Sequence, residues 1–229
     1  MNKQNKIKPT QVRKIKPTRI SVSGIYPFRG ESSVAYESTL ERDFIIRAEF
    51  FPDVLEVIPQ PVAIPFIANN GRQYTYTPDF LVYYRLDNCG YNKYPKPTLI
   101  EVKPEQEWKK HWREWMPKWK AAQRYAKKQG WKFHIHDETR IRDMSFENIR
   151  FLERYKRMSF PDEEIQAVLN SVELMGVTTP DHLLAKHFMG IYRAEGISLI
   201  WHLIATYQLT CDMRLPIDYF SELWRPIHE

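Results

Sequence analysis

Charged side chains stand within apolar runs where soluble proteins rarely place them. Asp79 heads the run "DFLVYY", and Glu101 and Lys103 flank Val102 in "TLIEVK". Because side chains alternate between the two faces of a strand, Glu101 and Lys103 share one face and Val102 points to the other. Burying an acid and a base costs free energy unless they pair or bind a metal ion. These residues are therefore candidates for a chemical site.

A further acid, Glu41, is predicted to point inward from a helix. In "ESTLERDFIIRAEFFPDV" (37–54), apolar residues recur at the helical period, and Glu41 lies on their arc although it is charged. Glu37, one turn earlier on the same face, is the rival for this role. The three acids Glu41, Asp79 and Glu101, together with the backbone carbonyl of Val102, offer oxygen ligands to one or two hard cations.

Magnesium is the expected cation, with Mn²⁺ as an allowed substitute, because it accepts carboxylates and keeps several waters. Such an ion lowers the pKa of bound water and offsets charge on a phosphate. Lys103 would lie beside the nucleophilic water, where it could orient or deprotonate that water or neutralise charge in the transition state. This combination predicts hydrolysis of a phosphodiester.

The elements around these residues predict an α/β fold. Strand-like runs occupy 54–59, 61–67, 74–85, 98–103 and 131–137, and Asn70-Gly71 suits a tight hairpin. A helical stretch follows residue 103, is broken or restarted at Pro117, and ends at Gly130. The order of helices and strands predicts a mixed sheet flanked by helices.

The last third of the chain reads as a separate, mainly helical module. Helices are predicted within 160–176, 179–190 and 196–209, and 210–220 reads as a short hairpin or wing. We expect three parts: a disordered basic arm over 1–20, a catalytic domain over 21–148, and a winged-helix-like domain over 149–229 that binds a partner.

Charge is distributed unevenly along the chain. The net charge is +6, yet residues 1–20 carry seven basic residues and no acid, and residues 151–229 sum to −4. The arm is either a DNA- or partner-binding segment or a solubilising tail. A second basic stretch follows the catalytic strand and predicts phosphate contacts. Its candidate DNA-binding residues are Lys109, Lys110, Arg113, Lys118, Lys120 and Arg124.

Four tryptophans accompany these bases at helical spacing. Core packing is the default explanation for such a stripe, and stacking on DNA is the alternative. The stripe consists of Trp108, Trp112, Trp115 and Trp119. Gln60, next to two prolines, is interpreted as a buried polar residue, with a role beside the metal left open.

Cysteine usage and hydropathy indicate a cytoplasmic protein. Cys89 and Cys211 are far apart and form no CxxC motif, so a reducing compartment is the default. No apolar run approaches the roughly 18 residues that a membrane span needs. The N-terminus has no apolar core of a signal peptide. We expect a bacterial protein that associates with the nucleoid when active.

Four sequence blocks, taken in order, carry a resemblance to a known family. They are "ESTLERDF" (37–44), "QPV" (60–62), "YTPDFLV" (76–82) and "LIEVKP" (99–104), within which Pro78-Asp79 and Glu101-Val102-Lys103 match the PD-(D/E)XK nuclease pattern. The chain resembles TnsA, the endonuclease subunit of heteromeric cut-and-paste transposons. The resemblance implies a restriction-endonuclease-like fold, with Glu41, Asp79 and Glu101 as metal ligands and Lys103 as the catalytic lysine. Some TnsA proteins have Gln where Glu101 stands.

The resemblance also implies a reaction and partners. TnsA-like enzymes cut the 5′ strand of double-stranded DNA at transposon ends, while a DDE-type transposase cuts and joins the 3′ ends. An AAA+ ATPase regulator is expected to contact the C-terminal domain, whose acidic balance fits protein docking better than DNA reading. Two alternatives stay open: a stand-alone restriction or junction-resolving nuclease, and a non-cleaving adaptor between transposase and ATPase.

Overall fold

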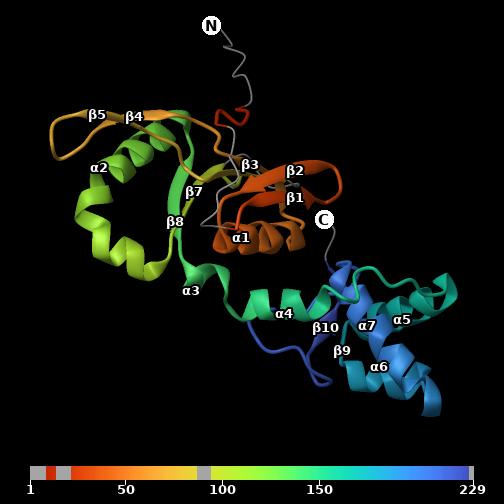
Figure 1. Cartoon of the computed structure of the whole chain (residues 1–229). Coiled ribbons are helices and arrows are strands. Elements are labelled where there is room, and N and C mark those ends of the chain that lie inside the picture. Colours follow the sequence, from red (N-terminus) through yellow and green to blue (C-terminus); the bar gives the residue numbers. More distant parts are fainter. Residues whose placement is uncertain (1–8, 14–21, 87–93, 227–229) are drawn as a thin grey trace, which may run out of the picture. The chain divides into compact units, whose positions relative to one another are not determined.

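The chain divides into two units, residues 1–141 and residues 142–229. A computed structural model describes residues 9–13, 22–86 and 94–226 (Figure 1). The predicted boundary after residue 148 falls inside a helix of the second unit, α4 (Met144–Leu152). Most of the predicted basic arm lies outside the described residues.

The first unit is built on a mixed sheet, as predicted, and this sheet has four strands. Its order is β3-β6-β7-β8; β3 with β6 and β6 with β7 are antiparallel, and β7 with β8 is parallel. The sheet strands are β3 (Val54–Pro59), β6 (Phe80–Tyr84), β7 (Thr98–Val102) and β8 (Lys132–His136). The helices are α1 (Thr39–Phe50), α2 (Glu105–Gln129) and α3 (Glu138–Ile141).

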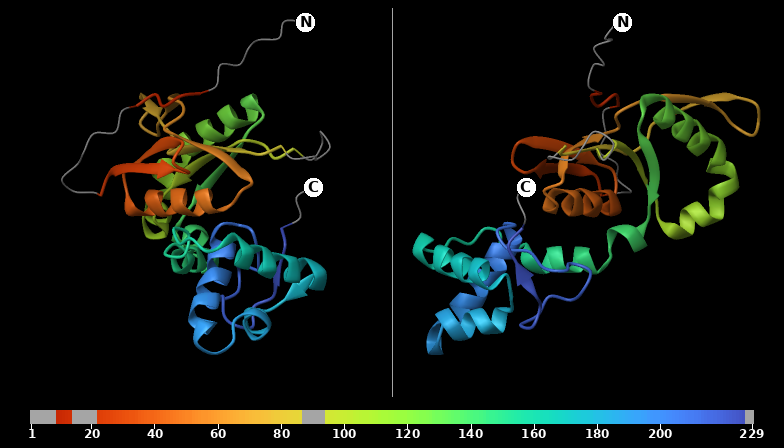
Figure 2. Two further views of the ribbon diagram at one scale, coloured as in Figure 1. Left: turned by 90° about the vertical axis from the view of Figure 1, so that its right-hand side faces the viewer. Right: turned by 180° about the vertical axis from the view of Figure 1, so that it is seen from behind.

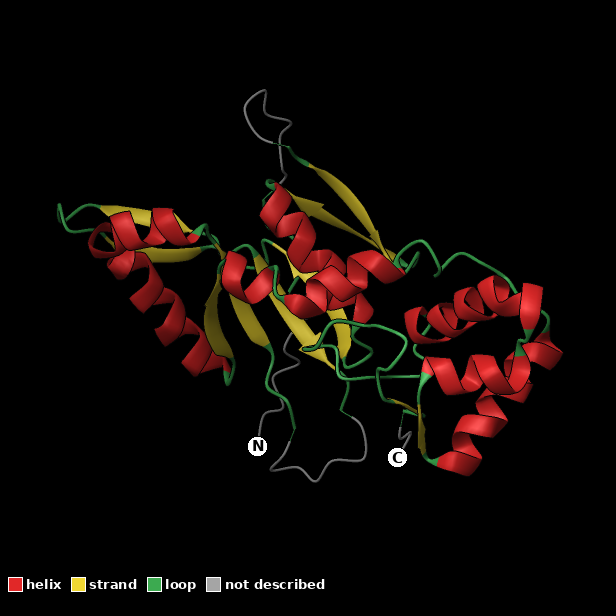
Figure 3. Ribbon diagram, turned by 90° about the horizontal axis from the view of Figure 1, so that it is seen from below, coloured by secondary structure: helices red, strands yellow, loops and turns green. Residues whose placement is uncertain are grey.

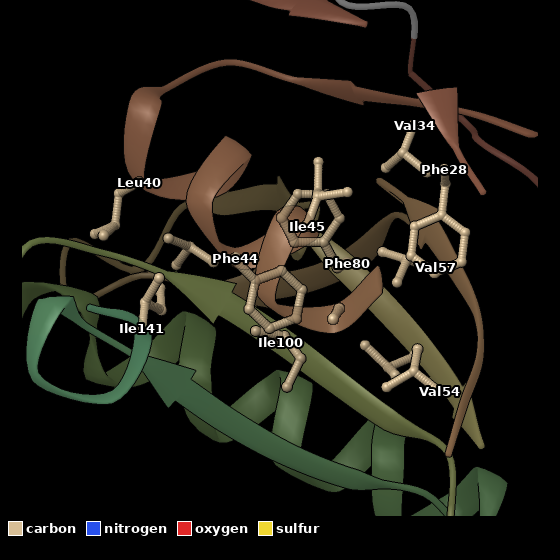
Figure 4. Packing of buried hydrophobic residues seen from close by; sticks show 13 residues of the cluster. Phe28, Val34, Leu40, Phe44, Ile45, Val54, Val57, Phe80, Ile100 and Ile141 are labelled. Atoms are coloured by element: carbon tan, nitrogen blue, oxygen red, sulfur yellow. The ribbon is translucent and has the colours of Figure 1, made fainter. Parts of the chain in front are cut away.

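Helices cover both faces of this sheet, and β7 is buried along its whole length. Ile100 and Val102 join an apolar cluster under α1, which Figure 4 shows from close by. Leu99 joins a second cluster under α2. The alternation along β7 therefore assigns Leu99 and Glu101 to the α2 face.

α1 lies within the predicted helical stretch 37–54, and α2 ends at Gly130 as predicted. Ser38 caps α1, because its hydroxyl accepts a hydrogen bond from the N–H of Glu41 at 3.1 Å. Gly130 ends α2 with a φ of 78°, a left-handed conformation that glycine adopts without strain. The predicted break at Pro117 is wrong: α2 continues through it, and Figure 2 shows the helix bending along its length.

Two antiparallel hairpins lie outside the main sheet. One, β1 (Gly24–Phe28) with β2 (Ser32–Tyr36), was not expected from the sequence. The other, β4 (Ile64–Ile67) with β5 (Gln73–Tyr76), forms around the predicted Asn70-Gly71 turn. The single strand predicted over 74–85 is therefore wrong, because the chain leaves this hairpin at Tyr76 and enters the main sheet at Phe80.

The second unit is mainly helical, as Figure 3 shows. After α4 come α5 (Asp162–Met175), β9 (Val177–Thr178), α6 (Pro180–His187), the 3₁₀ turn η2 (Gly190–Tyr192), α7 (Arg193–Ala205) and β10 (Leu223–Trp224). The stretch 210–220, predicted as a short hairpin or wing, contains turns and no strand pair of its own; Thr210 at its start forms an antiparallel bridge with Trp224 of β10, which pairs with β9. Across the described ranges, no helix has the length and apolarity to cross a bilayer.

Candidate active site

Three of the predicted residues converge at one end of the central strands. The ammonium nitrogen Nζ of Lys103 lies 3.6 Å from Oδ2 of Asp79 and 3.8 Å from Oε1 of Glu101. Asp79 comes from the segment just before β6, Glu101 from β7, and Lys103 directly follows β7. Residues 24 positions apart thus meet because β6 and β7 are paired neighbours in the sheet.

Backbone groups on two sides fix the position of Asp79. Its Oδ2 accepts a hydrogen bond from the N–H of Val102 at 2.8 Å. Its backbone carbonyl accepts a hydrogen bond from the N–H of Gln60 at 2.7 Å. Gln60 has a φ of 45°, a left-handed conformation that costs free energy in a residue with a Cβ. The surrounding fold holds that conformation, and with it the place of the Asp79 backbone.

Glu101 is the most deeply buried acid of the site, at 1% exposure. Its Oε2 accepts a hydrogen bond from the Tyr76 hydroxyl at 2.6 Å, and its Oε1 lies 3.3 Å from Nζ of Lys118 in α2. Both oxygens of this carboxylate thus have a protein partner. Tyr76 and Lys118 were not assigned to this site by sequence reasoning.

Burial and mutual charge shift the pKa values of the group. Burial, together with the charge of Glu101, raises the pKa of Asp79 well above its ordinary value. Burial acts to lower the pKa of Lys103, but the carboxylates of Asp79, Glu101 and Glu41 outweigh it and raise that pKa. Burial and Glu101 also raise the pKa of Tyr76 well above its ordinary value, so its hydroxyl remains a donor at neutral pH.

Glu41 is buried, as predicted, but its carboxylate is turned toward the start of its own helix. Its Oε2 accepts a hydrogen bond from the N–H of Glu37 at 2.7 Å, and its Oε1 accepts one from the Ser38 hydroxyl at 3.1 Å. This is close to a capping box, in which helix cap and acid satisfy each other. Burial raises the pKa of Glu41, while Lys103 acts in the opposite direction. Its role as a metal ligand stays a prediction.

The structure describes part of the N-terminal arm, and this part contacts Glu37 and Gln60 beside the site. Arg13 forms an ion pair with Glu37, the alternative to Glu41 as the inward acid of this helix, and donates from Nε to Oε1 of Gln60 at 3.2 Å. The N–H of Val12 donates to the backbone carbonyl of Gln60 at 3.0 Å. The side chain and the backbone carbonyl of Gln60 therefore contact the arm, while its backbone N–H bonds to Asp79.

The six predicted DNA-binding bases fall into separate environments. Lys109 pairs with Glu105 at 2.6 Å, and Lys110 is exposed. Lys118 is turned toward Glu101, with Nζ 3.3 Å from Oε1, and its DNA contact stays a prediction. The other three line a groove between α2 and the β4–β5 hairpin: Arg113, Lys120 and Arg124.

The tryptophan stripe is explained by packing at three of its four positions. Trp119 is buried, and Trp108 and Trp115 pack against the same cluster under α2. Trp108 also donates from Nε1 to Oδ2 of Asp137 at 3.1 Å. Trp112 is 43% exposed, with the guanidinium of Arg113 over its ring at 5.5 Å.

Two carboxylates of the site are placed so that they could bind a hard cation. Asp79 and Glu101 already direct carboxylate oxygens toward one ammonium group, so a cation is favourable between them. Across the described ranges, no three His, Cys, Asp or Glu side chains are placed to hold one metal ion. A third protein ligand would come from the Val102 carbonyl or from Glu41 after its carboxylate leaves the helix cap.

Comparison with protein families gives two matches. The model of the TnsA-like endonuclease N terminal matches residues 51–138, and that of the TnsA endonuclease C terminal matches residues 140–213. The chain belongs to the TnsA-type transposon endonucleases. The N-terminal match contains Asp79, Glu101 and Lys103, whereas Glu41 precedes it. Comparison with curated proteins gives no match. The predicted restriction-endonuclease-like fold class is confirmed.

In this TnsA-type chain, the inward direction of Lys118 could have been predicted from the helical period. Lys118 lies three residues after Trp115 and four before Ala122, both on the face of α2 that packs on the sheet. That spacing predicts an inward lysine. Tyr76 carried no comparable signal, because its contact with Glu101 depends on how the β4–β5 hairpin folds over β7.

Proposed function

We propose that this TnsA-type chain cuts the 5′, non-transferred strand at transposon ends, with a divalent cation, Mg²⁺ first, as cofactor. One observation carries the proposal: the Lys103 ammonium lies within 4 Å of both the Asp79 and the Glu101 carboxylate at the end of the central strands. Two acids and a lysine in this arrangement suit phosphodiester hydrolysis, which needs a bound cation and a donor at the reacting phosphate.

Each residue has a separate task in this proposal. Asp79 and Glu101 would hold the cation, helped by the Val102 carbonyl and by Glu41. The cation, when bound, supplies a water of lowered pKa and offsets charge on the phosphate. Lys103 offers three N–H donors and a positive charge to the phosphate oxygens as negative charge develops there.

The DNA backbone would follow the groove between α2 and the β4–β5 hairpin. Arg113, Lys120 and Arg124 line this groove, and Lys110 is exposed on the same helix. Phosphate contacts by such side chains position a duplex without reading its sequence. We therefore assign end recognition to the DDE-type transposase that joins the 3′ ends, and docking of an AAA+ regulator to the acidic unit 142–229.

The test is a reconstituted excision reaction with transposase, regulator and labelled transposon ends. We expect Asp79→Asn and Lys103→Met to lose 5′ cleavage at least hundredfold while 3′ joining continues, which yields fused products. Lys128→Met, an exposed lysine late in α2, is the matched control and should behave as wild type. Simple insertions at wild-type frequency from Asp79→Asn would overturn the proposal in favour of a non-cleaving adaptor.

A second arm of the experiment separates the TnsA-type role from an independent nuclease. The purified chain, given Mg²⁺ and transposon-end DNA but no transposase, should show almost no cleavage. Efficient cutting by the chain alone would instead favour a restriction or junction-resolving enzyme.

A further inference from the structure

Lys118 is a second lysine at the site, supplied by a different element from Lys103. Its Nζ lies 3.3 Å from Oε1 of Glu101, and its side chain is 18% exposed. Three aromatic rings surround the ammonium group, with centroids 4.6 Å away for Trp115, 5.0 Å for Tyr76 and 5.8 Å for Trp119. Rings at these distances attract a cation and exclude water from it.

Both carboxylate oxygens of Glu101 are restrained by neighbouring side chains. Tyr76 donates to Oε2 at 2.6 Å, and Lys118 approaches Oε1 at 3.3 Å. Lys103 lies slightly farther from Oε1, at 3.8 Å. Two fixed contacts from α2 and the β4–β5 hairpin therefore set the rotation of the carboxylate, while Lys103 links it to Asp79.

Fold stability alone does not account for this arrangement. Withdrawing an ammonium and a carboxylate from water costs several kcal/mol for each ion, and apolar residues of similar volume often serve a core as well or better. The neighbours of Lys118 on its helix, Trp119 and Ala122, follow that apolar rule. The buried pair of Lys118 and Glu101 therefore indicates a functional role for Glu101.

We infer that Lys118, with Tyr76, is a positioning residue for Glu101: it fixes the orientation of the carboxylate for the cleavage step and competes with the cation for Oε1. This inference rests on the proposed nuclease function. Because a fixed ammonium repels a divalent ion nearby, Lys118 weakens metal binding, and because it holds the carboxylate in one orientation, it speeds cleavage.

The two effects make a signature that simple structural damage does not produce. Lys118→Met keeps an unbranched side chain between the rings and removes the charge. We expect the full-length variant to bind Mn²⁺ at least tenfold more tightly in calorimetry. At saturating Mn²⁺, its 5′ cleavage in the reconstituted reaction should turn over at least tenfold more slowly. A misfolded site would weaken both properties together.

Tyr76→Phe provides a second route to the same conclusion. It keeps the ring beside Lys118 and removes only the hydroxyl that donates to Oε2. We expect at least tenfold slower 5′ cleavage with Mn²⁺ affinity changed by less than threefold. Wild-type turnover in this variant would overturn the inference even if Lys118→Met failed to fold. Lys128→Met again serves as the charge-matched control.

The outcomes separate this inference from the proposed function. If Asp79→Asn abolishes Mn²⁺ binding but Lys118→Met matches wild type in affinity and turnover, the metal site stands and the role of Lys118 falls. If Lys118→Met binds Mn²⁺ more weakly, the competing charge is refuted. If the wild-type chain binds no Mn²⁺, both the metal site and the positioning role are wrong.

Discussion

Glu41 is the residue for which local structure and proposed chemistry differ most. Its carboxylate completes the cap of α1, yet its charge also acts on Asp79 and Lys103. We expect Glu41→Gln to lose 5′ cleavage at least tenfold and to keep the unfolding free energy within about 1 kcal/mol of wild type, because Gln also serves at this position of a capping box. Reconstituted cleavage and urea unfolding measure the two effects.

Ser38→Ala is the control for that experiment, because it removes the cap hydroxyl and leaves the carboxylate in place. It should lower the unfolding free energy by about 1 kcal/mol, the typical worth of an N-cap side chain, and keep cleavage near the wild-type rate. Equal cleavage by Glu41→Gln and Ser38→Ala would show that Glu41 only caps the helix, and the metal would then need other ligands.

Cys211 allows a test of burial in the second unit. Burial, with the nearby Asp212 carboxylate, raises the pKa of its thiol to about 11. Since only the thiolate reacts, about one thousandth of this cysteine is reactive at pH 8. In a Cys89→Ser background, iodoacetamide should label folded Cys211 at least a hundredfold more slowly than the guanidinium-unfolded chain. Comparable rates would contradict its burial.

The site could be predicted in part from the sequence because strand alternation is a short-range rule. It assigned Glu101 and Lys103 to one face, and the structure brings both to Asp79. Lys118 was predicted to contact DNA because it belongs to a basic stretch. The helical period, which places it on the face of α2 that packs on the sheet, was not considered for it. The direction of the Glu41 carboxylate could not be predicted, since inward placement on a helix does not say which neighbour the acid bonds.

At the scale of elements, α2 and the β4–β5 hairpin depend on each other through Pro117. Proline has no N–H, so the carbonyl of Arg113, four residues earlier, lacks its usual helical donor. The side-chain amide of Asn69 in the hairpin turn donates to that carbonyl at 3.2 Å. The helix thus continues through a proline, against the predicted break, and gains a bond to the hairpin.

Pro117→Ala should therefore loosen the hairpin while it restores the helical bond. An alanine N–H would take the Arg113 carbonyl, and Asn69 would lose a hydrogen bond worth about 1 kcal/mol. We expect amide hydrogen exchange in residues 64–76 to rise about fivefold, the exchange equivalent of that energy. Asn69→Ala should raise it equally without affecting α2. Unchanged protection in both variants would mean that Asn69 does not restrain the hairpin.

Other elements show where periodicity is a sufficient guide. β7 was predictable because a continuous apolar run predicts a central strand. The run 74–85 was misread because its apolar pattern continues across Pro78, whereas the strands on either side belong to different sheets. The β1–β2 hairpin gave a weak signal, since only Phe28 and Val34 of its ten residues are buried.

At the scale of the whole molecule, each unit has its own buried core. Leu99 is fully buried in the first unit, between the sheet and α2, and Leu199 is fully buried in α7 of the second. A chain with two cores is expected to lose them in separate steps, since cooperativity follows contact within a core. The two units also differ in charge, because residues 101–132 are rich in basic side chains and residues 151–229 have a net negative charge.

Paired core variants test this independence in the full-length chain. Leu99→Ala and Leu199→Ala each remove a buried side chain, which costs about 2–5 kcal/mol in the core that loses it. In native-state hydrogen exchange, we expect Leu99→Ala to lower protection in β6, β7 and α2 but not in α5–α7, and Leu199→Ala to do the reverse. If either change lowers protection across both units, the chain unfolds as one cooperative body. The proposed nuclease and partner-binding functions would then depend on a single unfolding free energy.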